Sequence, residues 1–386
     1  MHPHLEALHR ALGREQRAEA EELERLGRLS ESEQVAAGFA WPPLVVIAAQ
    51  RSGRRYRATL QVSTGMVPHD GIGPGDSILI AGHSGSCLGV EERHAEVILG
   101  RRLDEGRVVR VTQRHDPATF VRYRQALEHA DGVTSPLRAA LLGDQPLVGA
   151  QEPSRKDLGQ AALEALVGLD PTQRRAAEHA LAAAALAVVH GPPGTGKTRM
   201  LAALLAALVA RGERAWALAE SNAAVDNLAV AAAAKLDVVR LGHTARIGSA
   251  AAPLSLDARI AAGHLGPALA AIDKDLGRAE GAELRALLDE RRRLRTQARA
   301  LVLEHADVVA VTFGSLARLA PALPRVTTAV VDEATQAAEP AVWVAVPHVE
   351  RLVIVGDPHQ LGPVSKAHTE LERSLLERLV AEARLP

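Results

Sequence analysis

The chain contains, between an apolar run and a helical pattern, the stretch Gly191-Pro192-Pro193-Gly194-Thr195-Gly196-Lys197-Thr198. The apolar run before it is Leu186–His190, and the segment after it is rich in alanine and leucine. A glycine-rich turn between a strand and a helix is typical of a phosphate-binding loop, because its backbone N–H groups and the helix N-terminus attract anions. A glycine turn without chemical meaning is the alternative, but it does not explain the full match in this context.

This loop predicts a site for ATP and Mg²⁺. Lys197 is expected to reach the β- and γ-phosphates, and the Thr198 hydroxyl to ligate Mg²⁺. The residues expected to wrap the phosphates are Gly191, Pro192, Gly194, Thr195 and Gly196.

Two adjacent carboxylates, Asp332 and Glu333, end another apolar run. Side chains alternate at the end of a strand, so the two groups point in different directions. We assign Asp332 to Mg²⁺ and Glu333 to the catalytic base. Such a pair can also be a plain strand-to-turn boundary, but a phosphate-binding loop upstream in the same sheet favours the catalytic interpretation.

Two glutamines lie where they could contact a nucleotide. Gln360, in the loop Gly356–Pro363, could hydrogen-bond the γ-phosphate, although Gly-Asp-Pro is also an ordinary turn. Gln173 follows an expected N-cap at Asp170 and Pro171 at the first helical position. Its amide can read adenine with a donor and an acceptor, or it can serve only in helix capping.

From residue 169 onward, apolar runs alternate with alanine-rich helical patterns, which predicts an α/β fold with a doubly wound parallel sheet. The expected strands are Leu186–His190, Ala215–Ala219, Val238–Leu241, Val308–Val311, Ala329–Asp332 and Leu352–Val355. A helical insertion of two segments is expected at about 254–303. Arginines cluster at 291–299 in its second segment, and a charge run of this kind is usually a solvated face.

The residues before 169 show other patterns, which divide them into three expected segments. Residues 1–37 predict a stalk-like helix, and residues 38–115 contain short strand-like runs between glycine turns, which suggest a small β-barrel. Residues 116–168 are expected to form a returning helix and a polar linker around 143–157, and residues 169–386 the ATP-binding domain.

Together these elements resemble superfamily 1 helicases, and specifically the up-frameshift and immunoglobulin-mu-binding-protein group of the 5′-to-3′ branch. The resemblance runs from Leu169 to Leu379, where Ala219–Leu228 and Val311-Thr312 match two further motifs. It implies a RecA-like domain in which Gln336 and Gln360 sense the γ-phosphate.

The same resemblance implies contacts with the backbone of single-stranded DNA or RNA, without distinguishing the two. The residues at the matching positions are Ser221, Asn222 and Thr312. Ser221-Asn222 could also be a helix N-cap, and Thr312 a simple strand-end residue. The barrel resembles, more weakly, an accessory domain that covers the nucleic-acid channel in this group.

A complete motor of this family has a second RecA-like domain, with an arginine that completes the ATP site. We expect that domain to be absent from these 386 residues. A truncation, a split helicase with a separate C-terminal half, and a retained half-motor all remain open. Because such an arginine contributes about 10³–10⁵ in rate, this chain alone should hydrolyse ATP slowly.

The amino-acid composition excludes some classes of protein but does not indicate a function. A net charge of −1 gives no global argument for nucleic-acid binding, and the lone Cys87 excludes an internal disulfide. No apolar run predicts a membrane span, so a cytoplasmic protein is the expectation. Two rival interpretations remain: a nucleotide-gated binding or scaffold protein without unwinding activity, and a P-loop ATPase unrelated to nucleic acid, which would leave Gln336 and the Ala219–Leu228 motif unexplained.

Overall fold

The computed structural model describes residues 1–52, 55–68, 71–144, 155–276 and 278–382. The chain divides into a barrel unit, Leu12–Val121, and a sheet unit, Met1–Ala11 with Arg122–Pro386. The predicted linker around 143–157 lies mostly outside the described residues. Among the described helices, none combines the length and the apolar character that crossing a membrane would require.

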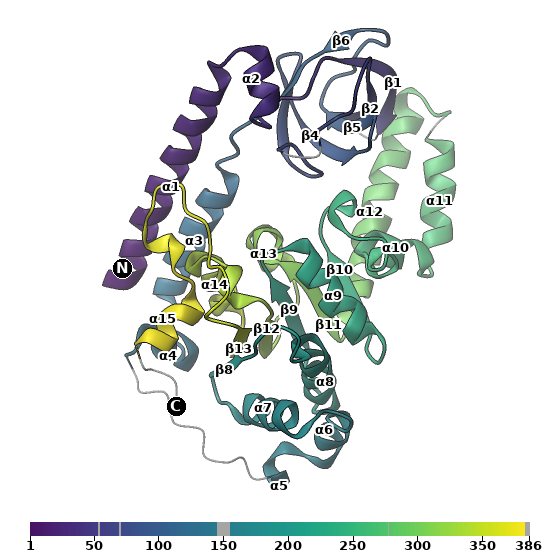
Figure 1. Ribbon diagram of the computed structural model, residues 1–386. Helices are drawn as coiled ribbons and strands as arrows, with labels where there is room; N and C mark the ends of the chain where they lie inside the picture. The colour runs from purple at the N-terminus through teal and green to yellow at the C-terminus, as the bar shows by residue number, and fades with distance from the viewer. Residues whose placement is uncertain (53–54, 69–70, 145–154, 277, 383–386) are drawn as a thin grey trace. The chain divides into compact units, whose positions relative to one another are not determined.

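The barrel unit is built on an antiparallel sheet of order β6-β1-β2-β5-β4-β3-β7 (Figure 1). Its strands are β1 (Leu44–Ser52), β2 (Arg55–Val62), β3 (Ser77–Ile80), β4 (His83–Val90), β5 (His94–Leu99), β6 (Val108–Val109) and β7 (Val111–Gln113). Only Arg110 separates β6 from β7, yet β6 pairs with β1 and β7 pairs with β3, the two strands that would otherwise be edges. The sheet therefore closes on itself as a barrel-like structure.

Alternating side chains fill this barrel. In β5 the buried residues are Ala95, Val97 and Leu99, and the residues between them are partly exposed, as expected where one face of a strand meets a core. The helices that contribute residues to this unit are α1 (Pro3–Gly27), α2 (Glu31–Ala36) and α3 (Ala118–Gly132).

The sheet unit contains a parallel sheet of order β10-β11-β9-β12-β13-β8. Its strands are β8 (Leu186–His190), β9 (Ala215–Ala219), β10 (Val238–Leu241), β11 (Val308–Thr312), β12 (Thr328–Val331) and β13 (Arg351–Gly356). These are the six strands predicted from the sequence, each bounded within one residue of the prediction. The α/β fold class with a parallel sheet and an antiparallel barrel-like sheet is thereby confirmed.

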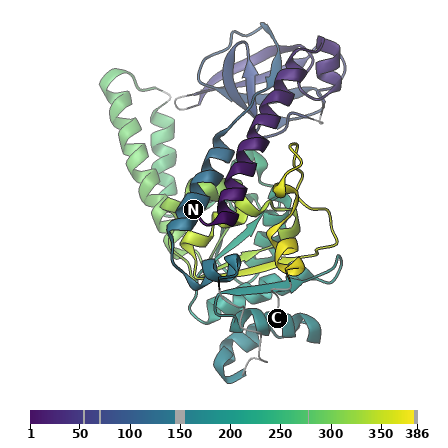
Figure 2. The same cartoon turned by 90° about the vertical axis from the view of Figure 1, so that its left-hand side faces the viewer.

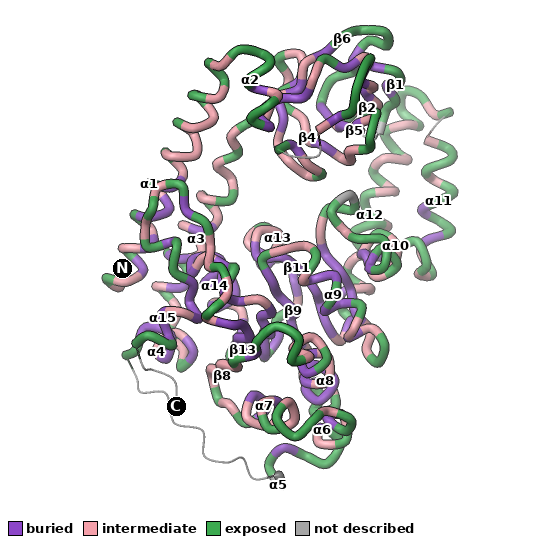
Figure 3. Tube along the Cα trace, viewed as in Figure 1, coloured by how far each residue is buried: buried purple, intermediate pink, exposed green. Residues whose placement is uncertain are grey.

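The sheet unit also contains helices. They are α4 (Pro136–Leu142), α5 (Arg155–Leu158), α6 (Gln160–Ala165), α7 (Pro171–Ala182), α8 (Lys197–Ala210), α9 (Asn222–Ala233), α10 (Leu256–Ala262), α11 (Gly266–Asp275), α12 (Gly281–His305), α13 (Phe313–Leu319), α14 (Glu339–Trp343) and α15 (Leu375–Ala381). Side chains of α7, α8 and α9 pack against the sheet in one hydrophobic core, and the buried residues in Figure 3 gather on the inner strands and on α8. A sheet covered in this way holds its strands in place and leaves their carboxyl ends to loops.

In its described residues, the insertion after β10 contains three α-helices, α10, α11 and α12, rather than the two predicted. Gly263 caps the end of α10 and Gly281, with φ of 57°, opens α12. The long helix α12 lies beside α11 (Figure 2). Its arginines pair with nearby carboxylates: Arg291 with Asp273 at 2.5 Å, and Arg295 with Asp257 at 2.7 Å. This pairing favours a solvated, ion-paired face.

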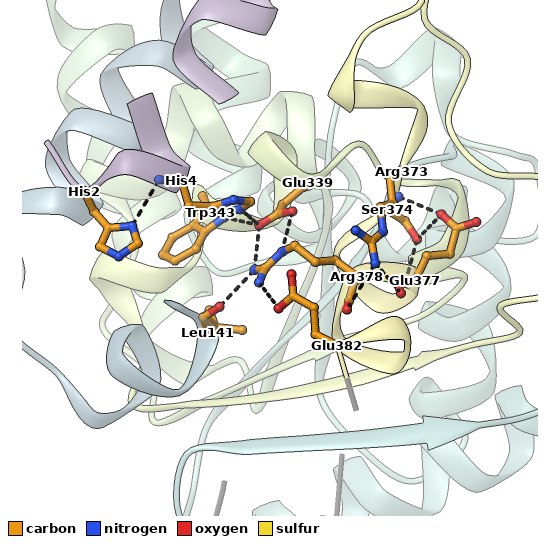
Figure 4. A network of polar contacts seen from close by, with 10 residues as sticks. All are labelled: His2, His4, Leu141, Glu339, Trp343, Arg373, Ser374, Glu377, Arg378 and Glu382. Carbon is orange, nitrogen blue, oxygen red and sulfur yellow. Dashed lines mark hydrogen bonds and ion pairs between the residues drawn. The ribbon is translucent and has the colours of Figure 1, made fainter. Parts of the chain in front are cut away.

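A buried ion pair joins α14 to α15 in the sheet unit (Figure 4). Arg378 donates from Nε to Glu339 Oε2 at 2.9 Å and from Nη2 to Glu339 Oε1 at 2.8 Å. The same Oε1 accepts from Trp343 Nε1 at 3.0 Å and lies 2.7 Å from His4 Nε2. Burial acts to raise the pKa of Glu339, but the His4 hydrogen bond and the Arg378 charge outweigh it and lower the pKa to about 2.

Candidate functional site

The phosphate-binding loop follows β8 at the carboxyl edge of the parallel sheet. The backbone N–H of Gly191 donates to the Gly356 carbonyl at 3.0 Å, which ties the start of the loop to the end of β13. Gly194 and Gly196 both hold φ of 77°, a left-handed conformation that favours glycine. A Cβ at Gly191 would lie 2.6 Å from Lys197 Cγ, so the absence of a side chain there lets Lys197 fold over the loop.

Lys197 and Glu333 face each other across this loop. The Lys197 ammonium lies 3.6 Å from Glu333 Oε1. Glu333 Oε2 is buried and has no hydrogen-bond partner among the described residues, and Glu333 holds a left-handed φ of 49°, which costs a residue with a Cβ about 1–3 kcal/mol. An orphaned buried oxygen on a strained residue is typical of a functional site rather than of packing.

Asp332 is the buried neighbour of Glu333. Its Oδ1 accepts from the Glu333 backbone N–H at 2.9 Å, and only 4% of the residue is exposed. Burial, and to a smaller degree the Glu333 charge, raise the pKa of Asp332 to about 6. An oxygen ligand in this position suits a divalent cation, which would favour its ionised form. Thr198, the other expected Mg²⁺ ligand, is the second residue of α8.

Gln173 lies directly against the phosphate-binding loop. Its Nε2 donates to the Thr195 carbonyl at 2.7 Å, and its Oε1 accepts from the Asp170 backbone N–H at 3.3 Å as part of a capping box. The helix-capping role considered from the sequence is therefore present, and the amide also contacts the phosphate-binding loop.

The loop after β13 contains an aspartate that sequence reasoning left without a role. Asp357 Oδ1 accepts from the His359 backbone N–H at 3.0 Å and lies 3.1 Å from His190 Nε2. The His359 N–H lowers the pKa of Asp357, and hydrogen bonds from the His190 and Gln360 side chains act in the same direction. Gln360 is thereby held beside the end of β8. The signal for this arrangement in the sequence was that His190 ends one predicted strand and His359 follows another in the same sheet.

A second unforeseen contact joins the Asp332–Gln336 motif to the same loop, since the Thr335 hydroxyl donates to the Asp357 carbonyl at 2.9 Å. Gln336 ends the short 3₁₀ turn Ala334–Gln336 and is exposed. The structure thus groups Lys197, Asp332 and Glu333 directly, and places Gln336 and Gln360 on the adjoining loops.

The candidate nucleic-acid contacts lie farther along the same edge. Ser221 caps α9 by accepting from the Ala224 N–H at 3.1 Å, and Thr312 caps α13 by accepting from the Ser315 N–H at 3.4 Å. Thr312 at the end of β11 is the register partner of Ala219 at the end of β9, so the two helix starts are neighbours. Asn222 is the first residue of α9 and is half-buried.

Comparison with known proteins agrees with this geometry. The sequence profile of the family described as "AAA domain" matches residues 168–281 and 270–368, more than half of the chain. The chain is 31% identical over 307 residues to the "DNA-binding protein SMUBP-2" of Mesocricetus auratus, covering 72% of this chain and 30% of that protein.

Two fungal relatives extend the comparison. The chain is 28% identical over 324 residues to the "DNA polymerase alpha-associated DNA helicase A" of Schizosaccharomyces pombe, covering 75% of this chain and 47% of that protein. It is 32% identical over 231 residues to the "ATP-dependent helicase NAM7" of Saccharomyces cerevisiae, covering 56% of this chain and 23% of that protein. The chain therefore spans less than half the length of each of these relatives.

The fold and the loop geometry define a P-loop nucleotide-binding protein of the AAA-domain class. Within that class the chain belongs to the superfamily 1 helicases of the up-frameshift group.

Proposed function

We propose that residues 169–386 form a RecA-like ATP-binding domain of a helicase or translocase, with a helical insertion at about 254–303 and a barrel as accessory domain. With a second RecA-like domain, it hydrolyses ATP to move 5′-to-3′ on single-stranded DNA or RNA. The observation that carries this proposal is that one edge of the parallel sheet holds two separate groups of motifs. The nucleotide motifs follow β8, β12 and β13, and the candidate nucleic-acid contacts follow the neighbouring strands β9 and β11.

In this proposal the nucleotide is held by groups that the chain itself supplies. The N–H groups of the phosphate-binding loop and the Lys197 ammonium bind the β- and γ-phosphates. Thr198 and Asp332 would hold Mg²⁺, which supplies charge neutralisation on the phosphate oxygens when bound. The orphaned Glu333 Oε2 is suited to accept a proton from the attacking water.

The adjoining glutamines report on the nucleotide. Gln336 and Gln360 are proposed to sense the γ-phosphate from the loops after β12 and β13. Gln173 is proposed to read adenine, for which its amide must exchange the contacts with Asp170 and Thr195 for contacts with the base.

On the nucleic-acid side, the Ser221 hydroxyl and the Asn222 amide are proposed to donate to backbone phosphates beside Thr312. Both helix starts contribute partial positive charge there. Contacts of this kind give little base specificity and a strong dependence on salt. A second RecA-like domain, on the same polypeptide or on a separate one, is the proposed partner for full activity.

The test is ATP hydrolysis by the full chain, with and without a candidate C-terminal half. Phosphate release is measured in the presence of a single-stranded oligonucleotide, blunt duplex or neither, and Lys197→Ala is the catalytic control. We expect slow turnover by the chain alone and single-strand-stimulated turnover when the second half is present.

Two results would contradict the proposal. Stimulation by blunt duplex but not by single strands would exclude a single-strand track. Nucleotide-dependent binding of oligonucleotide with no turnover under any condition would favour a nucleotide-gated scaffold instead.

A further inference from the structure

Arg240, in β10, is a buried charged residue outside the nucleotide site. It contacts α9, the helix that begins at the candidate nucleic-acid edge of the sheet. Its exposed fraction is 0%. Nε donates to Asp226 Oδ1 at 2.6 Å, Nη2 donates to Asn222 Oδ1 at 2.8 Å, and Nη1 donates to the carbonyl of its own neighbour, Leu241. All three guanidinium nitrogens are therefore engaged.

Asp226 completes the arrangement from the same helix as Asn222, one turn farther along α9. Its Oδ1 neutralises Arg240, and its Oδ2 accepts from the Gly248 N–H at 2.6 Å in the loop after β10. A buried ion pair is weak support for stability, because the desolvation of both charges offsets their attraction. The pair needs another explanation, and the contact between Arg240 and Asn222 provides one.

The contact with Arg240 determines which end of the Asn222 amide faces outward. A guanidinium carries donors and no acceptor, so only the amide oxygen can face Arg240. The amide NH₂ group must then point away from Arg240, and it donates to no other described residue. A phosphate oxygen accepts hydrogen bonds, so an outward NH₂ suits it and an outward oxygen would repel it.

We propose that Arg240 is a positioning residue for nucleic-acid binding: held by Asp226, it locks the Asn222 amide with its NH₂ group toward the backbone phosphate of a single strand. The inference rests on the proposed function, since it takes Asn222 as a phosphate contact. It adds that the contact depends on a buried arginine 18 positions away in the sequence, one that touches neither nucleotide nor nucleic acid.

The test is a double-mutant cycle between Arg240→Lys and Asn222→Ala. Lysine keeps the charge beside Asp226, but its single ammonium lacks the fork that binds carboxylate and amide together. Affinity for a fluorescein-labelled single-stranded oligonucleotide is measured by anisotropy at two salt concentrations. We expect each single variant to bind about 2–10-fold more weakly, and the double variant no more weakly than either.

Arg351→Lys is the matched control. Arg351 is a buried arginine of the same sheet and pairs with Glu213 and Thr328. It is the first residue of β13, so it lies at the amino ends of the strands, whereas the candidate nucleic-acid contacts lie at the carboxyl ends. We expect this variant to lose thermal stability without losing oligonucleotide affinity, and its effect to add to that of Asn222→Ala. If Arg240→Lys fails to fold, the pair Arg240→Met with Asp226→Leu removes both charges and is measured in its place.

The outcomes separate the two proposals. If Asn222→Ala weakens binding and the cycle with Arg240 is additive, the positioning role is overturned and the proposed function stands. If Asn222→Ala leaves single-strand binding unchanged, the phosphate contact itself is wrong and both statements fall.

Discussion

Two charged clusters of the sheet unit differ in how deeply they are buried and in how far their charges are satisfied. Glu339 and Arg378 form two hydrogen bonds with each other, and the remaining groups bind His4, Trp343 and the Leu141 carbonyl. At the sheet edge, Lys197 stands 3.6 Å from Glu333, and one Glu333 oxygen has no described partner.

The difference shows what each cluster is for. In the first, hydrogen bonds lower the pKa of Glu339 to about 2 despite its burial; in the second, burial raises the pKa of Asp332 to about 6. Charges that are fully paired hold helices together, whereas charges left incompletely paired at a sheet edge are typical of a site that a ligand completes. Substitutions in the two clusters should therefore change different properties.

The largest effect is expected at Lys197. Lys197→Ala should abolish measurable binding of Mg·ATP, because the loop loses its one ammonium, and the fold should remain intact. Binding of a labelled ATP analogue measures this, with the exposed Lys235→Ala as control. Equal affinity in the Lys197 variant and the parent would overturn the phosphate-binding assignment.

Glu333→Gln should lower hydrolysis by about 10²–10⁴-fold when a second half is present, with ATP binding retained, because the shape is kept and the base is lost. Its thermal stability should not fall, since the change removes an incompletely paired buried charge. Phosphate release and a melting curve on the same preparation report both quantities. Unchanged turnover would assign the base to another carboxylate.

Glu339→Gln should show the opposite pattern. It leaves the buried Arg378 with only the partly exposed Glu382 as a charged partner, and breaking a buried ion pair typically costs up to about 3–5 kcal/mol in the free energy of unfolding. Nucleotide affinity of the folded protein should be unaltered. Urea unfolding with an unchanged slope tests the first statement, and a loss of nucleotide affinity in folded Glu339→Gln would show that the two clusters are coupled.

The Glu339 carboxylate should also make the stability of the protein depend on pH in the acid range. Because folding lowers the pKa of Glu339 from 4.5 to about 2, its contribution to stability is present above pH 4.5 and is lost as the pH falls toward 2. The free energy of unfolding of the parent should decline more steeply than that of Glu339→Gln over this range. Parallel curves in the two proteins would contradict the ion-pair account.

The smallest effect is expected at Thr312. Thr312→Val removes the α13 cap, at a cost of about 0.5–2 kcal/mol in stability, and should weaken single-strand affinity only several-fold. The loss of affinity should be similar for different base sequences, because the contact is to the backbone. Anisotropy with two unrelated oligonucleotides tests this, and a sequence-selective loss would point to a base contact.

Much of the architecture could be inferred from local patterns. The six parallel strands are short apolar runs, and burial on both faces makes such runs continuous in the sequence. The strand β4, His83–Val90, was not predicted, because its glycines and serines carry no alternation of apolar residues. The third helix of the insertion was missed because two segments imply one break, and a second break, among those near Gly263 and Gly281, gives no clear signal in a helix-prone stretch.

The nucleotide motifs could be proposed from the sequence alone, because a phosphate-binding loop and an adjacent acid pair each consist of consecutive residues. Partners distant in the chain required the tertiary structure. Arg240 reaches Asn222 across 18 positions, and Arg378 reaches Glu339 across 39. These contacts follow from strand order and helix packing, which bring together side chains that no local pattern relates, and that packing determines which charges are satisfied and which remain available to a ligand.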